Sequence, residues 1–487
     1  MNNRIQVGLI CLVFMSSLCS LLSSGCQVGP DYVRPEYTVS DQWHQKAIKG
    51  LEGGSADLQT WWRVFNDPVL ESLIQRSGTM NLDLQIAYAR VMESRALLGV
   101  AAGEHWPSVD AFGAYSRTRP SENGLLAGLP VDTTDQRNMH SAGVDASWEI
   151  DVFGRISRSV ESAHASMEAS IENYRDVLVS LYSQIAQSYV DLRAIQTRIQ
   201  YAQDNIKLQQ DTLKLTRDRR AADLVPELDV QQAELVLAST ESSIPLLRQF
   251  EAQAIHRLSV LLGQSPAFLY EELSATSHIP EIPEDIAVGL PAELLRQRPD
   301  IRRAERVLAA QTSDIGVATA GLYPAFSLSG TFAMQSQQAK YIGDWNSRTW
   351  GFGPGMRWNL FDGDRIRSSI DVQEAQAEQA MIDYEKTVLL ALEEVENAMV
   401  AFAEEQQRVE ALERSVAAAA KSVELVKTLY EIGLTDFQNV LDMQRALTQQ
   451  QDQLAESRGQ VASNLVRVYT ALGGGWSVES PETSDTE

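Results

Sequence analysis

Few of the residue types that catalyse reactions or bind metals occur in this chain at spacings that would let them act together. No two of its six histidines stand at the HExxH spacing of a zinc helix, and no Gly-x-Ser-x-Gly elbow or phosphate-binding loop is present. Gly351, Gly353 and Gly355 resemble a nucleotide loop only weakly, because they lie in a segment that alternates like a strand, where we expect glycines to form a tightly packed face. The sequence therefore predicts a protein that is not an enzyme, with no catalytic residues, metal site or cofactor.

The three cysteines point to a covalent modification, the attachment of lipid. Cys11, Cys19 and Cys26 lie in an N-terminal segment with a basic start, an apolar run that contains serines, and small residues before Cys26. This pattern is typical of a secretory signal peptide, and cleavage before Cys26 would leave one cysteine and no possible intrachain disulfide. We expect residues 1–25 to be a lipoprotein signal peptide and Cys26 to carry the lipid; the alternative is an ordinary signal peptide and an unmodified cysteine. Gln27, which follows in place of aspartate, implies sorting to the outer membrane by the lipoprotein rules.

Charge and composition exclude a nucleic-acid binder. The chain has 487 residues, with 65 acidic against 41 basic side chains and a formal net charge of −24. Such a chain lacks the basic surface that binding to phosphates requires. Hydrophobic residues make up 44% of the sequence, which is enough apolar material for a large core.

An internal duplication organises the chain. The segment from Trp148 to Arg155 recurs loosely from Trp358 to Arg365, and other short matches recur at offsets between 210 and 217 residues. A period this long excludes a solenoid and indicates a duplicated structural unit. We expect each copy to contain a short helix, two strands around a loop, and two very long helices.

Heptad repeats predict the long helices, at residues 155–219, 226–263, 365–432 and 436–472. In the third of these, apolar residues stand at every seventh position, beside a companion seam that only Glu405 interrupts: Val388, Val395, Phe402, Val409, Val416, Val423 and Tyr430. Sustained heptads specify coiled-coil packing. The first helix of each pair would run for about 65 residues, which at about 1.5 Å per residue is roughly 100 Å. No compact globular domain needs helices of that length.

Alternating apolar and polar residues predict four strands, at about residues 107–117, 140–150, 324–335 and 349–360. Segments of this length with one apolar face suit transmembrane β-strands, although a soluble antiparallel sheet with one wet face alternates in the same way. Four strands cannot close a barrel, and an open sheet edge is excluded from hydrocarbon. Strands that span a membrane would therefore require oligomerisation, and three copies would supply twelve strands.

Three separated sequence motifs resemble those of a known protein family. They are CQVGPDYVRP at residues 26–35, LRQRPDI at 295–301 and ALGGGW at 471–476, in that order along the chain. Together they resemble the TolC-like outer-membrane efflux proteins, or outer membrane factors, of the OprM-like lipoprotein branch. The resemblance covers essentially the whole mature chain.

This resemblance implies a mixed α and β membrane protein that works as a homotrimer. A twelve-stranded transmembrane β-barrel would be continued by a twelve-helix coiled-coil α-barrel, with an equatorial girdle around it. Such proteins are passive exit ducts of the Gram-negative outer membrane, with a long periplasmic portion. They dock to a periplasmic adaptor (membrane fusion) protein and an inner-membrane pump, here expected to be of the resistance-nodulation-division type. Drugs, metals, solvents and oligosaccharide signals all leave through such ducts.

The resemblance also places candidate gate residues at the two hairpin turns, residues 219–227 and 430–439. It implies that Asp442 is a pore-facing acid at the constriction, and that Asp229 and Tyr430 form a pair that ties neighbouring hairpins in the closed state. Threefold symmetry would turn each aspartate into a ring of like charges that repel one another and attract cations. The alternative is that both are acids in the first turn of a helix, where the macrodipole favours them.

Two positions in these turns depart from the family pattern. Thr435 stands where the family commonly has arginine, so we expect a basic closing link to be missing there. Asp223 stands where the first turn usually has glycine, but aspartate tolerates the left-handed conformation better than most residues. Gly433 keeps the matching position in the second turn.

These patterns divide the chain into six parts. They are a lipoprotein signal peptide (1–25), a loop-like lipid-anchored extension (26–66), a first structural repeat (67–263), an equatorial linker (264–298), a second structural repeat (299–476) and an acidic disordered tail (477–487). The alternative function is a trimeric coiled-coil lipoprotein that acts as a structural tether or adhesin. Such a protein would not need paired alternating strands and would not conduct ions.

Overall fold

The computed structural model describes residues 27–35, 43, 51–53, 58–119, 121, 136–282, 286–288 and 297–476. The chain divides into two compact units: unit 1, with Met1–Pro35, Val91–Ala169 and Ala304–Tyr384, and unit 2, with Glu36–Arg90, Ser170–Arg303 and Glu385–Glu487. The expected signal peptide, the lipidation site Cys26 and the expected acidic tail lie outside the described residues. Within the described ranges, no helix combines the length and the apolar character needed to cross a membrane.

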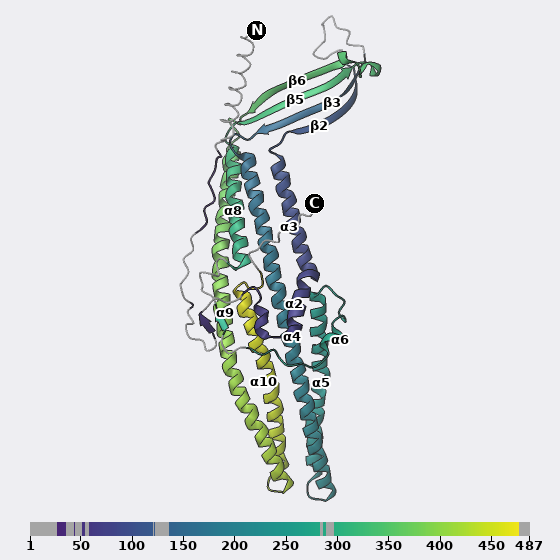
Figure 1. Cartoon of the computed structure of the whole chain (residues 1–487), viewed down its shortest axis with the longest axis vertical. Helices are drawn as coiled ribbons and strands as arrows, with labels where there is room; N and C mark the ends of the chain where they lie inside the picture. The colour runs from purple at the N-terminus through teal and green to yellow at the C-terminus, as the bar shows by residue number, and fades with distance from the viewer. Residues whose placement is uncertain are drawn as a thin grey trace. The chain divides into compact units, whose positions relative to one another are not determined.

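The two halves of the chain repeat the same order of elements (Figure 1). In each half a 22-residue helix precedes two strands, a 67-residue helix and a 35-residue helix. The first half contains α3 (Leu82–Gly103), β2 (Ser108–Thr118), β3 (Arg137–Ile150), α4 (Arg155–Ala221) and α5 (Glu227–Leu261). The second half contains α8 (Pro299–Ala320), β5 (Ala325–Ser336), β6 (Arg348–Arg357), α9 (Arg365–Glu431) and α10 (Phe437–Ala471). These ends lie within a few residues of those that the sequence patterns predict.

Short elements occupy the segments expected to be an extension and a linker. In unit 2, β1 (Leu51–Gly53) pairs in parallel with β4 (Ile286–Val288). Strands of three residues are too short to show alternation, which is why the sequence does not predict this pair. The remaining short elements of the described ranges are η1 (Trp61–Phe65), α2 (Pro68–Met80), α6 (Tyr270–Leu273), η2 (Ala339–Tyr341) and η3 (Trp345–Ser347).

Unit 1 contains a four-stranded antiparallel sheet in the order β2–β3–β5–β6, so the two repeats meet where β3 pairs with β5. Residues paired across the register share a face of the sheet. One face carries apolar rows, such as Ala111, Val144, Phe332 and Trp350. The adjacent row on the other face is polar and consists of Asp110, Asp145, Thr331 and Gly351. The alternation in the sequence thus becomes one apolar and one polar face.

Both faces of this sheet are largely open in the single chain. Trp350 and Phe352 on β6 are 65% and 79% exposed. A Cβ atom added at Gly351 or Gly353 would meet nothing within 4 Å. In the single chain the prediction of a tightly packed face is therefore wrong for Gly351 and Gly353, because no neighbouring side chain reaches them. A Cβ at Gly355, in contrast, would stand 3.0 Å from the Ser327 hydroxyl oxygen.

A tryptophan fixes each strand pair to the turn before it. The indole Nε1 of Trp148 donates to the carbonyl oxygen of His105 at 2.8 Å, and that of Trp358 donates to the carbonyl of Leu322 at 3.0 Å. Both carbonyls belong to the turn between a 22-residue helix and the first strand of its repeat. The duplicated tryptophans therefore make the same contact in both halves of unit 1.

Heptad residues bury the seam between α9 and α10 in unit 2. Val388, Val395 and Phe402 are completely buried, and α10 contributes an equally spaced buried set of Val440, Leu447, Leu454, Val461 and Val468. Glu405 interrupts the companion seam, but its carboxylate accepts a hydrogen bond from Ser457 of α10. A polar group inside the seam is thus satisfied by the facing helix.

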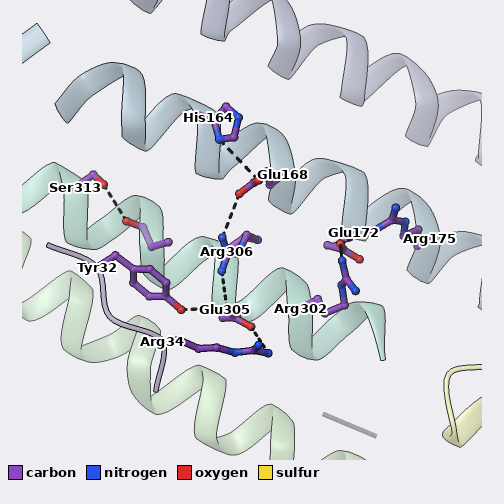
Figure 2. Close-up of polar contacts among 11 residues, drawn as sticks. Tyr32, Arg34, His164, Glu168, Glu172, Arg175, Arg302, Glu305, Arg306 and Ser313 are labelled. Atoms are coloured by element: carbon purple, nitrogen blue, oxygen red, sulfur yellow. Dashed lines mark hydrogen bonds and ion pairs between the residues drawn. The ribbon is translucent and has the colours of Figure 1, made fainter. Parts of the chain in front are cut away.

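The second and third sequence motifs meet in unit 2. The Arg298 guanidinium donates to the carbonyl of Ala471 and to Glu394, each at 2.7 Å, and to both oxygens of Asp300. The ring of Trp476 lies against the guanidinium groups of Arg175 and Arg302, at 4.6 and 5.2 Å. Both of these arginines also bind Glu172 (Figure 2). In this unit the motifs that support the resemblance hold the fold together.

Candidate functional site

The first hairpin turn of unit 2 joins α4 to α5. The Leu224 amide donates to the carbonyl of Arg219, and the Asp223 amide donates to that of Arg220, each at 3.0 Å. This is the Schellman arrangement, which requires a left-handed residue after the helix. Asp223 supplies it with φ of 57°, so the turn survives without the usual glycine.

The second hairpin turn joins α9 to α10 in the same way. The Leu434 amide donates to Leu429 at 2.9 Å, and the Gly433 amide donates to Tyr430 at 3.0 Å. Gly433 has φ of 78° and is the left-handed residue of this turn. The two turns are therefore structural equivalents, with Asp223 and Gly433 in the same role.

Side chains from all four long helices form one apolar cluster beside these turns. The Tyr430 ring lies 5.2 Å from the Phe437 ring, measured between centroids. The buried members are Leu213 of α4, Val230, Ala233 and Val236 of α5, Val426 and Tyr430 of α9, and Phe437, Val440 and Leu441 of α10. The two hairpins of one chain thus share a core at their turns.

Asp229 and Tyr430, the predicted tie, lie in this region. Tyr430 is 3% exposed, and its hydroxyl has no hydrogen-bond partner in the described part of the chain. Burial raises the pKa of Tyr430; the Thr216 side chain lowers it, the nearby carboxylate of Asp229 raises it, and Arg219 lowers it. Burial and the charge of Asp436 raise the pKa of Asp229, whereas Arg219 lowers it. Within one chain the two residues therefore interact through charge, without a hydrogen bond from the tyrosine.

Asp442 and Thr435 make only local contacts. The Asp442 carboxylate accepts a hydrogen bond from Gln438 at 2.9 Å and lies 3.9 Å from Arg445. The Thr435 hydroxyl accepts one from the Asn439 amide, also at 2.9 Å. These contacts organise the start of α10, and the pore-facing role of Asp442 stays a prediction.

Arg219 is a residue of this site whose role the sequence does not predict. Its side chain leaves the end of α4 and reaches the end of α9, where it contacts Tyr430 and Glu431. Arg217, Arg219 and Arg220 are close neighbours in the sequence. A cluster of basic residues before a turn is a visible signal, but spacing alone does not indicate which arginine crosses to the second hairpin.

A second site, in unit 1, holds the segment that follows Cys26. Residues 27–35 lie along α4 and α8, and Gly29 comes so close to Gly316 that an added Cβ would stand 2.4 Å from the Gly316 Cα. Arg158, whose side chain is 2% exposed, donates to the carbonyls of Val28 and Gly29 and binds Asp31 at 2.6 Å. A buried guanidinium thus clamps this segment, which we call the N-terminal strap.

The far end of the strap is held by a network of charges (Figure 2). The Tyr32 hydroxyl donates to Glu305 at 3.2 Å, and Arg34 pairs with the other oxygen of that carboxylate at 3.0 Å. Arg306 binds both Glu305 and Glu168 and lies over the Tyr32 ring. Burial, followed by Glu305, raises the pKa of Tyr32 to about 12. Tyrosine and two arginines therefore compensate one buried carboxylate.

The described residues contain no group of three or more His, Cys, Asp or Glu side chains that could hold a metal ion. The sites with clear geometry are the hairpin turns, the two-faced sheet and the N-terminal strap. The hairpin turns form a joint between helices, the sheet presents an apolar surface, and the N-terminal strap fixes the segment that follows Cys26.

Comparisons with known proteins agree on one kind of protein. The family model described as outer membrane efflux protein matches residues 73–264 and 290–474. Nodulation protein T of Rhizobium leguminosarum bv. trifolii is 33% identical over 457 residues, which cover 94% of this chain and 96% of that protein. The cation efflux system protein CusC of Escherichia coli O6:H1 is 28% identical over 459 residues, 94% of this chain and 97% of CusC.

Solved structures give the same result at the level of the fold. The structure of the outer-membrane channel OprN matches with a TM-score of 0.87 and 36% identity, and covers 93% of this chain and all of the OprN chain. The similarity therefore includes both repeats and the long helices.

Proposed function

Because the chain belongs to the outer membrane efflux protein family, we propose that it is the outer-membrane channel of a tripartite efflux system. It is a passive duct, without enzymatic activity or cofactor, through which small molecules pass from the periplasm and an inner-membrane pump to the exterior. The observation that carries this proposal is the sheet of unit 1, which exposes an apolar face and has β2 and β6 as its edges in the described chain.

The sheet supports a trimer with a shared barrel. An open strand edge in hydrocarbon leaves peptide groups without partners, at a cost of several kcal/mol for each. Pairing β6 of one copy with β2 of the next removes every edge, and three copies give a twelve-stranded barrel. Its apolar face would meet lipid, and the row with Asp145 and Thr331 would line a wet interior.

The long helices support a matching tube of twelve helices. Leu228 and Leu235 on α5 are each 62% exposed in the single chain, and Leu425 on α9 is 54% exposed. Leu228 and Leu235 stand seven residues apart, so they lie on one exposed face of α5, and Leu425 is an exposed apolar side chain of α9. Contact between hairpins of neighbouring copies would bury these side chains.

The assignment as an efflux channel also predicts a lipid anchor on Cys26 and two partner proteins. Gln27 packs against Gly154, just beyond the end of β3, so a lipid on Cys26 would enter the membrane near that end of the sheet. A periplasmic adaptor protein and an inner-membrane pump, which we expect to be of the resistance-nodulation-division type, would supply cargo and energy. The relatives' names refer to nodulation and to cation efflux, and we propose a small-molecule cargo here.

Conductance of the purified mature protein tests this proposal. In detergent it should have the mass of three chains, and it should give stepwise currents when added to a planar lipid bilayer. A water-soluble monomer without conductance would contradict the proposal. A trimer that does not conduct would favour the alternative, a structural tether or adhesin, although such a protein has no need of the apolar sheet face.

For the gate, we propose that Asp442 lines the constriction and that Asp229 and Tyr430 tie hairpins together, with Gly433 shaping the second turn. Because Thr435 stands where the family commonly has arginine, we propose that the tie lacks a basic link at this position. Replacing Tyr430 by Phe together with Asp229 by Ala should raise single-channel conductance, because it removes both partners of the tie.

The matched control is Glu227→Ala, which removes an acid from the same helical turn as Asp229 but one that faces Arg220. Its conductance should equal that of the unaltered channel. Since the Tyr430 hydroxyl has no partner within the described chain, the loss of that hydroxyl alone should not unfold the joint. Equal conductance of the double variant and the control would refute the tie.

A further inference from the structure

We propose that Arg219 is the positioning residue that locks the two hairpins of each chain together and thereby keeps the duct closed. The inference rests on the proposed channel function, and it concerns a contact within one chain rather than between copies. The closing role then belongs to an arginine of the first hairpin. In the second hairpin, Thr435 stands at the position where the family commonly has arginine.

The contacts are those of a helix cap supplied from another helix. Nη1 of Arg219 donates to the carbonyl oxygens of Tyr430 at 2.5 Å and Glu431 at 2.9 Å. Both carbonyls belong to the last turn of α9, whose acceptors have no amide donor within the helix itself; the Tyr430 carbonyl also accepts from the Gly433 amide of the turn. A positive charge there is favoured by the helix dipole as well as by the hydrogen bonds.

The same side chain also packs against the buried aromatic residue of the joint. The Arg219 guanidinium carbon lies 4.8 Å from the centroid of the Tyr430 ring. Nη2 passes close to the second turn, where a Cβ at Gly433 would stand 3.8 Å away. Stacking, two hydrogen bonds and the charge therefore act at one point between the hairpins.

Neighbouring basic residues do not duplicate this role. The last turn of α9 contains no basic residue of its own. Arg220 pairs with Asp223 at 2.7 Å and with Glu227 at 3.6 Å, both in the first hairpin. Arg217 pairs with Glu234 of α5, again in the first hairpin. Of Arg217, Arg219 and Arg220, it is Arg219 that bridges to the second hairpin.

The positive charge of Arg219 also acts on a carboxylate at the joint. Asp229 lies in the first turn of α5 and Asp436 precedes α10, so each hairpin brings one carboxylate to the joint, and the charge of Asp436 raises the pKa of Asp229. Arg219 lies close enough to lower the pKa of Asp229. Without this cation the repulsion between the two carboxylates would not be compensated, which weakens the joint.

The test compares three variants of the full trimer in a planar bilayer: Arg219→Met, Arg219→Lys and Arg220→Ala. Methionine keeps the apolar stem of the side chain but has no donors and no charge. Losing two charge-assisted hydrogen bonds should raise the open probability about tenfold or more. Lysine keeps the charge without the planar fork, so its open probability should lie between those of the methionine variant and the unaltered channel. Arg220→Ala should match the unaltered channel.

A second measurement separates a lock from a general loss of stability. If Arg219 acts through Tyr430, the single variant Tyr430→Leu should raise the open probability. The double variant Arg219→Met, Tyr430→Leu should then have an open probability close to that of Arg219→Met. Full additivity, or an unchanged open probability in Arg219→Met, would overturn the inference. If the methionine variant fails to assemble, the lysine variant decides, and an unchanged open probability there overturns it. Absence of conductance in the unaltered trimer would instead refute the proposed channel function.

Discussion

Chains that carry Phe332→Arg are expected not to assemble in the outer membrane. Phe332 lies in the middle of β5 (Ala325–Ser336), in an apolar row with Val144 and Trp350, and is 43% exposed in the single chain. An arginine on the lipid face of a barrel near the bilayer centre costs about 2–4 kcal/mol. Because a trimer would carry three of them, the total cost is about 6–12 kcal/mol. Heat-modifiable trimer in outer-membrane fractions, measured on semi-native gels, should fall below detection.

The adjacent residue supplies the matched control. Thr331 points to the other face of the sheet, where its hydroxyl donates to Asp145 at 2.6 Å. An arginine at this position would stand in the same row as two carboxylates, Asp145 and Asp110, which would compensate its charge. Thr331→Arg should therefore assemble to near-normal amounts.

Together the two variants test the orientation of the sheet. The same residue type, one position apart, should give opposite results because side chains alternate along a strand. If Phe332→Arg assembles as well as Thr331→Arg, the apolar face does not meet lipid, and the proposed barrel is wrong. If only Thr331→Arg fails, the faces are reversed.

The second large effect is expected at the N-terminal strap, from Gly29→Val. Gly29 has φ of 88°, which a β-branched residue strongly disfavours, and its Cβ would stand 2.4 Å from the Cα of Gly316 on α8. Backbone strain and overlap together should cost about 3 kcal/mol or more, which is enough to release the strap. Amides in residues 27–35 should lose protection in hydrogen exchange, and the melting temperature of the protein should fall.

Gly99→Val on α3 (Leu82–Gly103) is the control for this substitution. It introduces the same side chain in the same unit, but a Cβ at Gly99 meets nothing within 4 Å. We expect strap protection and melting temperature close to those of the unaltered protein, apart from a small gain, because valine has a higher helix propensity than glycine. Equal protection of the strap in both variants would show that the approach of Gly29 to Gly316 does not hold it.

The sequence alone determined the features that depend on local periodicity. The seam of α9 is visible as heptads, since burying one stripe of a helix requires apolar residues at fixed spacing. The strands are visible as alternation for the same reason, and equal helix lengths in both halves follow from the duplication. Turn chemistry is also local, which is why Asp223 could be expected to replace glycine in a left-handed position.

The gate assignment has a different origin. Asp442, Asp229, Tyr430 and Thr435 were predicted through resemblance to a family, because no pattern in one sequence indicates which acids face a pore. The structure of one chain places Asp229 and Tyr430 in the shared joint, and Asp442 and Thr435 at the start of α10.

Only the tertiary structure decided which distant residues meet. The pairing of β3 with β5 joins the two repeats, the choice of Arg219 over Arg220 depends on where α9 ends, and the clamp of Arg158 on Val28 spans 130 positions in sequence. Such contacts carry no periodic signal, since the strand pair forms between backbones far apart in sequence and each arginine donates to the carbonyls of a distant segment. These contacts depend on which segments lie close together in space, and no local pattern in the sequence shows that.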